Sequence, residues 1–348
     1  MNTPINTALC SFGMSGKLFH APFLLVHPGF KLYACWERSK QVIGEFYDDV
    51  TSYSSYDDLL ADTNVELVIV NTPNYTHYEF AKKALLAGKH IVVEKPFSVT
   101  VAQGEELIQL AKDKGVLISA YQNRRYDSDY RTIKKIIEEE WLGNIVEAEF
   151  HFDRFVEELS YKKHKETPGP GTGSLYDLGS HIIDQALQLF GWPKAIMGDI
   201  DIMRPISQVD DFFELILYYE TKRVRLRSTY VARQPIPGYV IHGMKGSFIK
   251  DKTNVQEDAL NRGELPVGEN WGKEDESEWG LLHTEKDGNI IKERVPSLKG
   301  QYMDYYEGIY QSIRNNAPVP VSAEDGLKVI RIIEAGYESS RSKKIVDL

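Results

Sequence analysis

The sequence predicts an α/β protein in two parts. Residues 1–123 are expected to form a Rossmann domain with a doubly wound parallel sheet, and residues 124–348 an α+β domain with an open, mainly antiparallel sheet. Three observations support this. Residues 5–122 alternate short apolar runs with helix-length segments, the pattern of a parallel sheet with right-handed crossovers. After residue 123, strand candidates follow one another without helices, and 348 residues exceed one typical domain.

The apolar runs of the first part are its expected strands. Gly88 and Gly115 follow two amphipathic segments, where glycine most easily takes the left-handed conformation of a helix end. We expect strands at 7–11, 30–37, 67–72, 90–94 and 116–121, and helices at 76–87 and 101–114.

The second part has longer strand candidates and fewer helices. The strands are expected at 145–155, 212–219, 223–230 and 239–243, and the helices at 128–140, 178–190 and 323–340. We expect the last helix to return and pack on the first domain. The charged residues 251–290 indicate a long excursion over the surface or the active site.

Composition argues against several classes of protein. The net charge of −10 disfavours a general nucleic-acid surface, and no apolar run approaches the roughly 20 residues that span a membrane. Cys10 and Cys35 lie in apolar runs and are expected to be small buried side chains in a reducing compartment. The N-terminus lacks a signal pattern, so we expect a cytoplasmic protein.

A glycine-containing turn follows the first strand. Gly13 would let the backbone approach a dinucleotide pyrophosphate, and Gly16 would let the next helix pack closely. Ser11 replaces the usual first glycine, which predicts a shifted turn, and an ordinary loop is the alternative. The candidate cofactor contacts here are Phe12, Gly13, Met14, Ser15 and Gly16.

The second strand ends in two residues that bear on the choice of cofactor. Glu37 lies about 20 residues beyond the glycines, where an acidic group meets the ribose hydroxyls of NAD. Arg38, followed by Ser39 and Lys40, could pair with the 2′-phosphate of NADP. The sequence therefore predicts NAD(P), with NADP slightly favoured.

Polar residues also end the third and fourth strands. Glu94 and Lys95 would reach the crevice where open α/β sheets bind ligands, and Pro96 stops the strand. A solvated turn is the alternative for this tripeptide alone. Candidate cofactor contacts at these ends are Thr72, Pro73, Asn74, His77, Glu94 and Lys95, with turn and cap chemistry an equal alternative for the first four.

A second cluster precedes the 178–190 segment. Asp177 and His181 are four residues apart, so they share a helix face, and Asp184 lies close to the same stripe. A carboxylate beside an imidazole orients it and raises its basicity, which suits proton transfer from a hydroxyl. A plain Asp–His pair in the core or on the surface is the alternative.

These motifs together resemble the Gfo/Idh/MocA family of NAD(P)-dependent oxidoreductases over essentially the whole chain. The residues that carry the resemblance are 11–16, Glu94-Lys95-Pro96 and the run from Asp177 to His181. Residues 18–22, 123–129, 176–181, 256–260 and 270–272 further resemble its scyllo-inositol dehydrogenase (NADP+) branch.

The resemblance implies hydride transfer to or from a cyclic polyol or sugar, with Lys95, Asp177 and His181 as the catalytic and substrate-binding set. His181 would be the general base, Asp177 would orient it or hold a neighbouring hydroxyl, and Lys95 would stabilise a developing alkoxide. No metal is needed. Asn123, Arg124 and Tyr126 are further candidate substrate contacts, whereas Arg125 could equally form a structural ion pair.

Three other functions remain open at this point: an NAD-dependent glycosidase on the same scaffold, a non-catalytic NADP-sensing protein and a structural dimerisation protein. We expect a homodimer or homotetramer, because few helices are available to cover both faces of the second sheet.

Overall fold

The computed structural model describes residues 3–38, 41–160 and 162–348, so Ser39 and Lys40 lie outside the described residues. The chain forms two compact units. The first contains residues 1–123, 256–271 and 301–327, and the second contains 124–255, 272–300 and 328–348. A single boundary at residue 123 does not describe this interleaving, because the chain passes between the units five times.

The first unit is built on a six-stranded parallel sheet in the order β3-β2-β1-β4-β5-β6. This confirms the doubly wound sheet. All four residues of β4 are buried, as expected for a strand covered on both faces. The short, half-exposed β3 was not predicted. The strands are β1 (Ile5–Leu9), β2 (Phe30–Trp36), β3 (Thr51–Tyr53), β4 (Leu67–Val70), β5 (His90–Glu94) and β6 (Ile118–Tyr121).

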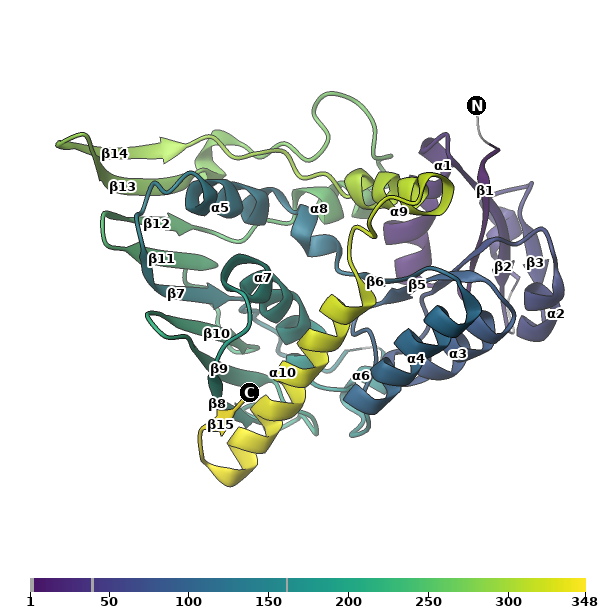
Figure 1. The fold of residues 1–348 in the computed structure, drawn as a ribbon, viewed down its shortest axis with the longest axis horizontal. Helices are drawn as coiled ribbons and strands as arrows, with labels where there is room; N and C mark the ends of the chain where they lie inside the picture. The colour runs from purple at the N-terminus through teal and green to yellow at the C-terminus, as the bar shows by residue number, and fades with distance from the viewer. Residues whose placement is uncertain (1–2, 39–40, 161) are drawn as a thin grey trace. The chain divides into compact units, whose positions relative to one another are not determined.

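The helices of the first unit come from three stretches of sequence. Figure 1 shows α3 and α4 side by side, and Gly115 ends α4 with a φ of 65°. The elements are η1, a π-helical turn (Gly16–His20), α1 (Ala21–Val26), η2 (Ile43–Glu45), α2 (Tyr56–Ala61), η3 (Asn74–Thr76), α3 (His77–Leu86), α4 (Val101–Lys114), α8 (Val255–Asn261) and α9 (Met303–Asn315). The short turn η4 (Asn123–Tyr126) follows β6.

The second unit is built on a nine-stranded sheet in the order β14-β13-β12-β11-β7-β10-β9-β8-β15. Neighbouring strands are antiparallel except β7 and β10, which confirms a mainly antiparallel sheet. The strands are β7 (Ile145–His151), β8 (Ala195–Asp201), β9 (Phe212–Tyr218), β10 (Arg223–Thr229), β11 (Tyr239–Gly243), β12 (Gly246–Lys250), β13 (Gly280–Lys286), β14 (Asn289–Val295) and β15 (Val346–Asp347).

Helices lie on one side of this sheet, where Figure 1 shows α5, α7 and α10. In β9, Leu215 and Leu217 are fully buried, whereas Ile216 between them is half-buried. The helical elements are α5 (Ser128–Glu138), α6 (Lys163–Glu166), the π-helical turn η5 (Leu175–Gly179), α7 (Ser180–Phe190), η6 (Glu276–Glu278) and α10 (Ala323–Ser342).

For the later part of the chain, one expectation was wrong and another holds only in part. Residues 251–290 are not a single excursion, because they contain α8 and β13, and β14 begins at Asn289. The expected packing of the last helix on the first domain holds only for its start: residues 323–327 of α10 belong to the first unit, where a Cβ on Gly326 would lie 2.8 Å from the Cβ of Phe97, and from residue 328 onward α10 belongs to the second unit. It packs on β8, where a Cβ added to Gly198 would lie only 2.5 Å from the carbonyl oxygen of Gly336.

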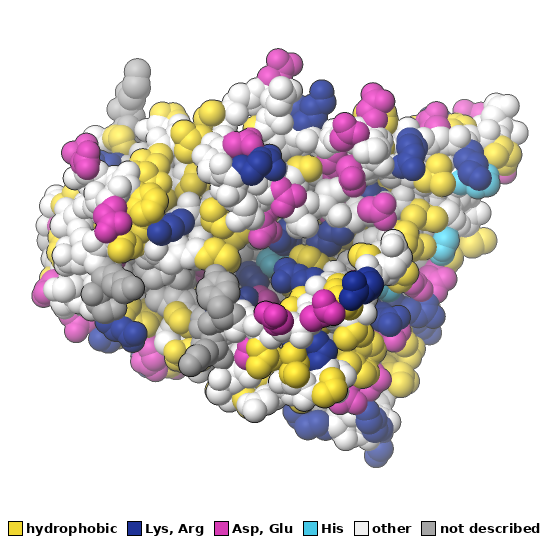
Figure 2. Space-filling model, turned by 180° about the vertical axis from the view of Figure 1, so that it is seen from behind, with side chains coloured by type: hydrophobic (Ala, Val, Ile, Leu, Met, Phe, Trp, Pro, Cys, Tyr) yellow, Lys and Arg dark blue, Asp and Glu magenta, His cyan; other side chains and the backbone are white. Residues whose placement is uncertain are grey.

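The surface carries both signs of charge, and Figure 2 shows acidic and basic side chains interspersed over the described residues of the visible face. No helix among the described residues is long and apolar enough to cross a membrane. Cys10 and Cys35 are free and buried, as expected, and burial raises the pKa of the Cys10 thiol to about 12.

Candidate active site

The turn after β1 is fastened to the end of β4. The backbone N–H of Ser11 donates to Asn71 Oδ1 (3.0 Å), and Ser11 Oγ donates to the Asn71 carbonyl (2.9 Å). Asn71 Nδ2 donates back to the Ser11 carbonyl (2.8 Å). Serine in place of the first glycine therefore joins two neighbouring strands at the edge where a Rossmann sheet binds its dinucleotide.

The glycines in this turn fit a dinucleotide. A Cβ on Gly16 would lie 2.5 Å from the Ser11 carbonyl oxygen, so no larger residue fits without movement. A Cβ on Gly13 would meet only Ser11 Oγ at 3.9 Å, which leaves open space beside the backbone for a phosphate. Met14 is exposed and Ser15 half-exposed, while the buried Phe12 packs edge-on against Phe46.

Glu37 and Arg38 have different surroundings. The Glu37 carboxylate is buried and accepts hydrogen bonds from Val42 N (2.8 Å), Ile43 N (3.2 Å) and Ser52 Oγ (2.8 Å). The carboxylate therefore fixes the backbone at Val42 and Ile43. Arg38 is exposed. A 2′-phosphate nearby would be repelled less strongly by the Glu37 carboxylate, because backbone N–H donors already neutralise part of its charge.

The loop after β4 is joined to the loop after β5 by His77. Its ring is fully buried, with Nδ1 2.9 Å from the Pro96 carbonyl oxygen and Nε2 2.8 Å from the Thr72 carbonyl oxygen. Burial lowers the pKa of His77 despite these contacts. The ring holds the two loops together and has no exposed surface, so its side chain offers no surface for the expected direct contact with a cofactor. Thr72, Pro73 and Asn74 are half-exposed.

Glu94 and Lys95 lie at the carboxyl end of β5, as the sequence predicted. Glu94 is buried, with Oε1 3.0 Å from His20 Nε2 and Oε2 accepting the backbone N–H of Lys95 (3.1 Å). Burial alone raises the pKa of Glu94. The hydrogen bond from His20 and the charges of His20, Lys95 and His77 outweigh this, and the net pKa lies below the ordinary value. Glu94 is therefore an ionised carboxylate inside the protein.

Among the predicted substrate contacts after β6, Arg124 is held by polar neighbours. Asn123 and Arg124 are buried and Tyr126 is half-buried. Arg124 Nη1 donates to Asp127 Oδ2 (3.1 Å) and to Asn254 Oδ1 (2.9 Å).

Arg125 forms a structural ion pair. It binds both oxygens of Asp184, through Nε at 2.7 Å and Nη2 at 2.6 Å. The ion-pair alternative for Arg125 is thus confirmed, and the Asp184 carboxylate serves this pair.

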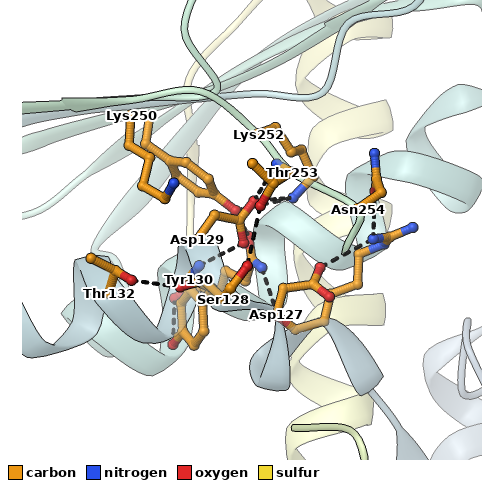
Figure 3. Close-up of polar contacts among 12 residues, drawn as sticks. Asp127, Ser128, Asp129, Tyr130, Thr132, Lys250, Lys252, Thr253 and Asn254 are labelled. Atoms are coloured by element: carbon orange, nitrogen blue, oxygen red, sulfur yellow. Dashed lines mark hydrogen bonds and ion pairs between the residues drawn. The ribbon is translucent and has the colours of Figure 1, made fainter. Parts of the chain in front are cut away.

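A buried polar cluster joins the start of α5 to the residues after β12 (Figure 3). Lys250 Nζ lies 2.6 Å from Glu274 Oε2, and both side chains are fully buried. Glu274 Oε1 accepts from Ser128 Oγ (2.5 Å) and Thr253 Oγ1 (2.6 Å), and Asp129 Oδ2 accepts from Thr253 N (3.0 Å). The cluster includes Thr253 and Glu274, so it fixes both ends of the segment between them. That segment begins with Asn254, the partner of Arg124.

The predicted catalytic pair lies where a π-helical turn meets α7. Asp177 is on η5, and His181 is the second residue of α7. π-helical turns are rare and often occur at functional sites. The helical segment begins at Leu175 and not at the predicted residue 178.

Asp210 caps this turn. It accepts from Leu175 N (2.9 Å), Ser174 Oγ (3.0 Å) and Tyr337 Oη (2.7 Å), and burial raises its pKa. Gly173, with a φ of +96°, makes room for it, since a Cβ there would lie 2.0 Å from Asp210 Oδ1.

Lys165 was not predicted as a site residue, yet its Nζ lies 2.8 Å from Asp177 Oδ2. The side chain of Lys165 is about one third exposed, and that of Asp177 is 19% exposed. The run of basic residues at 162–165 was the only signal in the sequence, and such runs are usually solvated. His181 is buried, with its ring centroid 6.2 Å from that of Phe152. Lys95 belongs to the first unit, and Asp177 and His181 belong to the second.

Comparison with known sequences identifies the family. Residues 5–122 match the oxidoreductase family's NAD-binding Rossmann fold, and residues 134–348 match the same family's C-terminal alpha/beta domain. The chain belongs to the Gfo/Idh/MocA family. This Gfo/Idh/MocA protein is an NAD(P)-dependent dehydrogenase or reductase, in keeping with the open backbone at Gly13.

Relatives of this Gfo/Idh/MocA chain match it over nearly their whole length. It is 39% identical to scyllo-inositol 2-dehydrogenase (NADP(+)) IolW of Bacillus subtilis (strain 168), covering 99% of this chain and 96% of the relative. It is 36% identical to the uncharacterized oxidoreductase YdgJ of Escherichia coli (strain K12), with 99% and 98% covered. The crystal structure of an oxidoreductase from Bacillus cereus is 32% identical, with a TM-score of 0.89 and 99% and 98% covered.

Proposed function

We propose that this enzyme transfers a hydride between NAD(P) and a secondary hydroxyl of a cyclic polyol or sugar, either inositol-like or an aldose. The observation that carries the proposal is the placement of Asp177 on η5 and of His181 at the start of the adjoining α7, with Lys95 at the carboxyl end of β5. The 39% identity to a scyllo-inositol 2-dehydrogenase supports this substrate class.

The cofactor is proposed to lie along the carboxyl edge of the parallel sheet. It would be held by the turn that contains Gly13 and Gly16, by Thr72 to Asn74 and by Arg38. The buried Glu94 would act indirectly, through its hydrogen bond to the backbone N–H of Lys95. When bound, the nicotinamide supplies the hydride acceptor or donor. The protein's own task is then to orient the substrate and to move the hydroxyl proton.

We propose that His181 accepts the proton of the substrate hydroxyl. An ordinary imidazole titrates near pH 6.5, so its neutral form can accept a hydroxyl proton at neutral pH. Asp177 orients a neighbouring hydroxyl, and Lys165 keeps that carboxylate in place through its 2.8 Å ion pair. Lys95 donates to the substrate oxygen and stabilises its developing negative charge. Asn123, Arg124 and Tyr126 line the substrate side.

A panel of inositols and aldoses, assayed for formation of NADH or NADPH, tests the substrate class. Net formation of reduced cofactor with a polyol supports a dehydrogenase. Release of an aglycone from a glycoside without net reduction would favour the glycosidase alternative. Cofactor binding without turnover on any substrate would favour the sensor.

Lys95→Ala and His181→Ala test the catalytic roles. Each should lose about 2–4 kcal/mol of transition-state stabilisation, which is typical of electrostatic and proton-transfer groups. Cofactor affinity and the unfolding midpoint should stay close to wild type. A variant that keeps nearly wild-type kcat on the true substrate would remove that residue from the catalytic set.

A further inference from the structure

Lys17 is a half-exposed lysine in the π-helical turn η1, directly after the last glycine of the turn that follows β1. Its ammonium lies over two aromatic rings, 4.2 Å from the ring centroid of Phe46 and 5.2 Å from that of Phe12. Phe12 follows β1, whereas Phe46 lies in the segment after the neighbouring strand β2. The ammonium is therefore on the side of the glycine turn that faces the segment after β2.

The rings of Phe12 and Phe46, called the aromatic pair here, are fixed within the first unit. They meet edge-on with centroids 5.4 Å apart, and the buried Phe12 also contacts Tyr47 edge-on at 5.8 Å. The Glu37 carboxylate accepts the backbone N–H of Ile43 (3.2 Å), and the Ile43 carbonyl in turn accepts the backbone N–H of Phe46 (3.0 Å). Glu37 thus helps to hold the backbone that carries one of the two rings.

The aromatic pair holds the ammonium without neutralising its charge. A cation is attracted to the face of an aromatic ring, but the ring carries no net charge that could cancel it. Over residues 3–38, 41–160 and 162–348, the Lys17 ammonium forms no ion pair within 4.0 Å and no hydrogen bond. The acidic residues near Phe46 in the chain, Glu45, Asp48 and Asp49, are exposed. Lys17 therefore offers a positive charge in a defined place.

The position of this charge relative to the Rossmann sheet indicates which part of a dinucleotide it would meet. The pyrophosphate binds at the helix start after β1, where the open backbone of Gly13 leaves room for it. The adenosine ribose binds toward the end of β2, from which the exposed Arg38 extends. Because Lys17 is turned toward the segment after β2, its ammonium is on the ribose side. A phosphate on the ribose 2′-oxygen carries about 1.5 to 2 negative charges at neutral pH.

We propose that Lys17 binds the 2′-phosphate of NADP from the glycine turn, opposite Arg38, and that the aromatic pair holds its ammonium ready for this contact. The inference rests on the proposed placement of the cofactor along the sheet edge. NAD lacks the 2′-phosphate, so Lys17 distinguishes the two cofactors by its charge. Fixing the cation before binding lowers the entropy that is lost when the phosphate is bound.

Calorimetric titration with NADP and with NAD, without substrate, tests the contact. Lys17→Met keeps an unbranched side chain against the rings and removes the charge. It should raise the Kd for NADP about tenfold or more, as expected for a charged hydrogen bond, and leave the Kd for NAD within about twofold. Lys17→Arg should keep most of the affinity for NADP. An equal loss for both cofactors would assign Lys17 to the pyrophosphate and overturn the proposal, as would unchanged affinity for NADP.

Lys31 provides the matched control. It also lies over an aromatic ring, 5.7 Å from the ring centroid of Tyr33, but it is exposed at the amino end of β2, away from the dinucleotide edge. Lys31→Met should leave both Kd values within about twofold of wild type. A loss of NADP affinity as large as that of Lys17→Met would show a general effect of net charge and would overturn the assignment to one site.

Phe46→Leu tests the aromatic pair. It should raise the Kd for NADP about twofold to fivefold, the change that corresponds to a cation–π contact of about 0.5–1 kcal/mol, and leave the Kd for NAD unchanged. A loss for both cofactors would place Phe46 against the adenosine itself and overturn its role in holding Lys17. These titrations need no substrate, so full activity of Lys95→Ala would refute the proposed catalytic set and leave the binding result standing.

Discussion

The two sheets bury their residues in different ways. In β4 of the parallel sheet every residue is buried, while in β9 of the nine-stranded sheet fully buried and half-buried residues alternate. The parallel sheet is an apolar layer, and the groups proposed to do its chemistry lie at strand ends. The other sheet buries apolar side chains on its helix side, keeps a half-exposed opposite face, and has a buried ion pair at the end of β12.

The largest expected effect on the free energy of unfolding comes from breaking that buried ion pair. Lys250→Met leaves the fully buried Glu274 carboxylate without its cation and should cost about 3–5 kcal/mol of the free energy of unfolding. The matched control is Arg225→Gln on β10, whose pair with Glu147 is more than one third exposed and worth at most about 1 kcal/mol. Urea unfolding followed by circular dichroism measures both, and equal losses would contradict the distinction.

The second prediction compares the same substitution in the two sheets. Ile69→Ala in β4 removes a fully buried side chain and should cost about 2–5 kcal/mol, whereas Ile216→Ala in β9 should cost about 1 kcal/mol or less in an isolated chain. A second copy covering the half-exposed face would make the cost of Ile216→Ala depend on protein concentration.

Light scattering at micromolar concentration checks that assembly. We expect wild type to be a homodimer or homotetramer, and Ile216→Ala to dissociate at higher concentration than wild type. A wild-type monomer at this concentration would contradict the expectation.

The smallest effect concerns one strand end of the parallel sheet. Arg38→Ala should raise the KM for NADP tenfold or more, about 1.4 kcal/mol per decade, and leave the KM for NAD nearly unchanged. The reason is that Arg38 is exposed while the Glu37 carboxylate is bound by Val42 and Ile43. Cofactor titrations of wild type, Arg38→Ala and Glu37→Gln separate the two residues. A wild type that uses NAD alone would assign the preference to Glu37.

The sequence predicted the parts of the fold whose signal is local. The apolar run of β5 and the helical spacing of α4, with Gly115 behind it, were placed at the observed bounds. β14 was missed because most of its residues are exposed, so no apolar pattern marks it. Segment 255–261 carries a helix whose surrounding charges suggested a loop.

Among the candidate site residues, too, those with a local signal in the sequence could be predicted. Motif residues such as Glu94 and Asp177 could be named from their neighbours in the chain. Lys165 could not, because its ion pair with Asp177 spans an irregular loop. Nor could Tyr306, whose hydroxyl lies 2.9 Å from His20 Nδ1 although the two residues are 286 positions apart in the sequence.

That separation has a consequence for synthesis on the ribosome. The parallel sheet is complete once residue 121 has emerged, yet its unit also includes residues 301–327. Most of the chain must therefore be synthesised before α9 can place Tyr306 beside His20. Until then Glu94 and His20 lack part of their surroundings, so the end of β5 reaches its final form among the last events of translation.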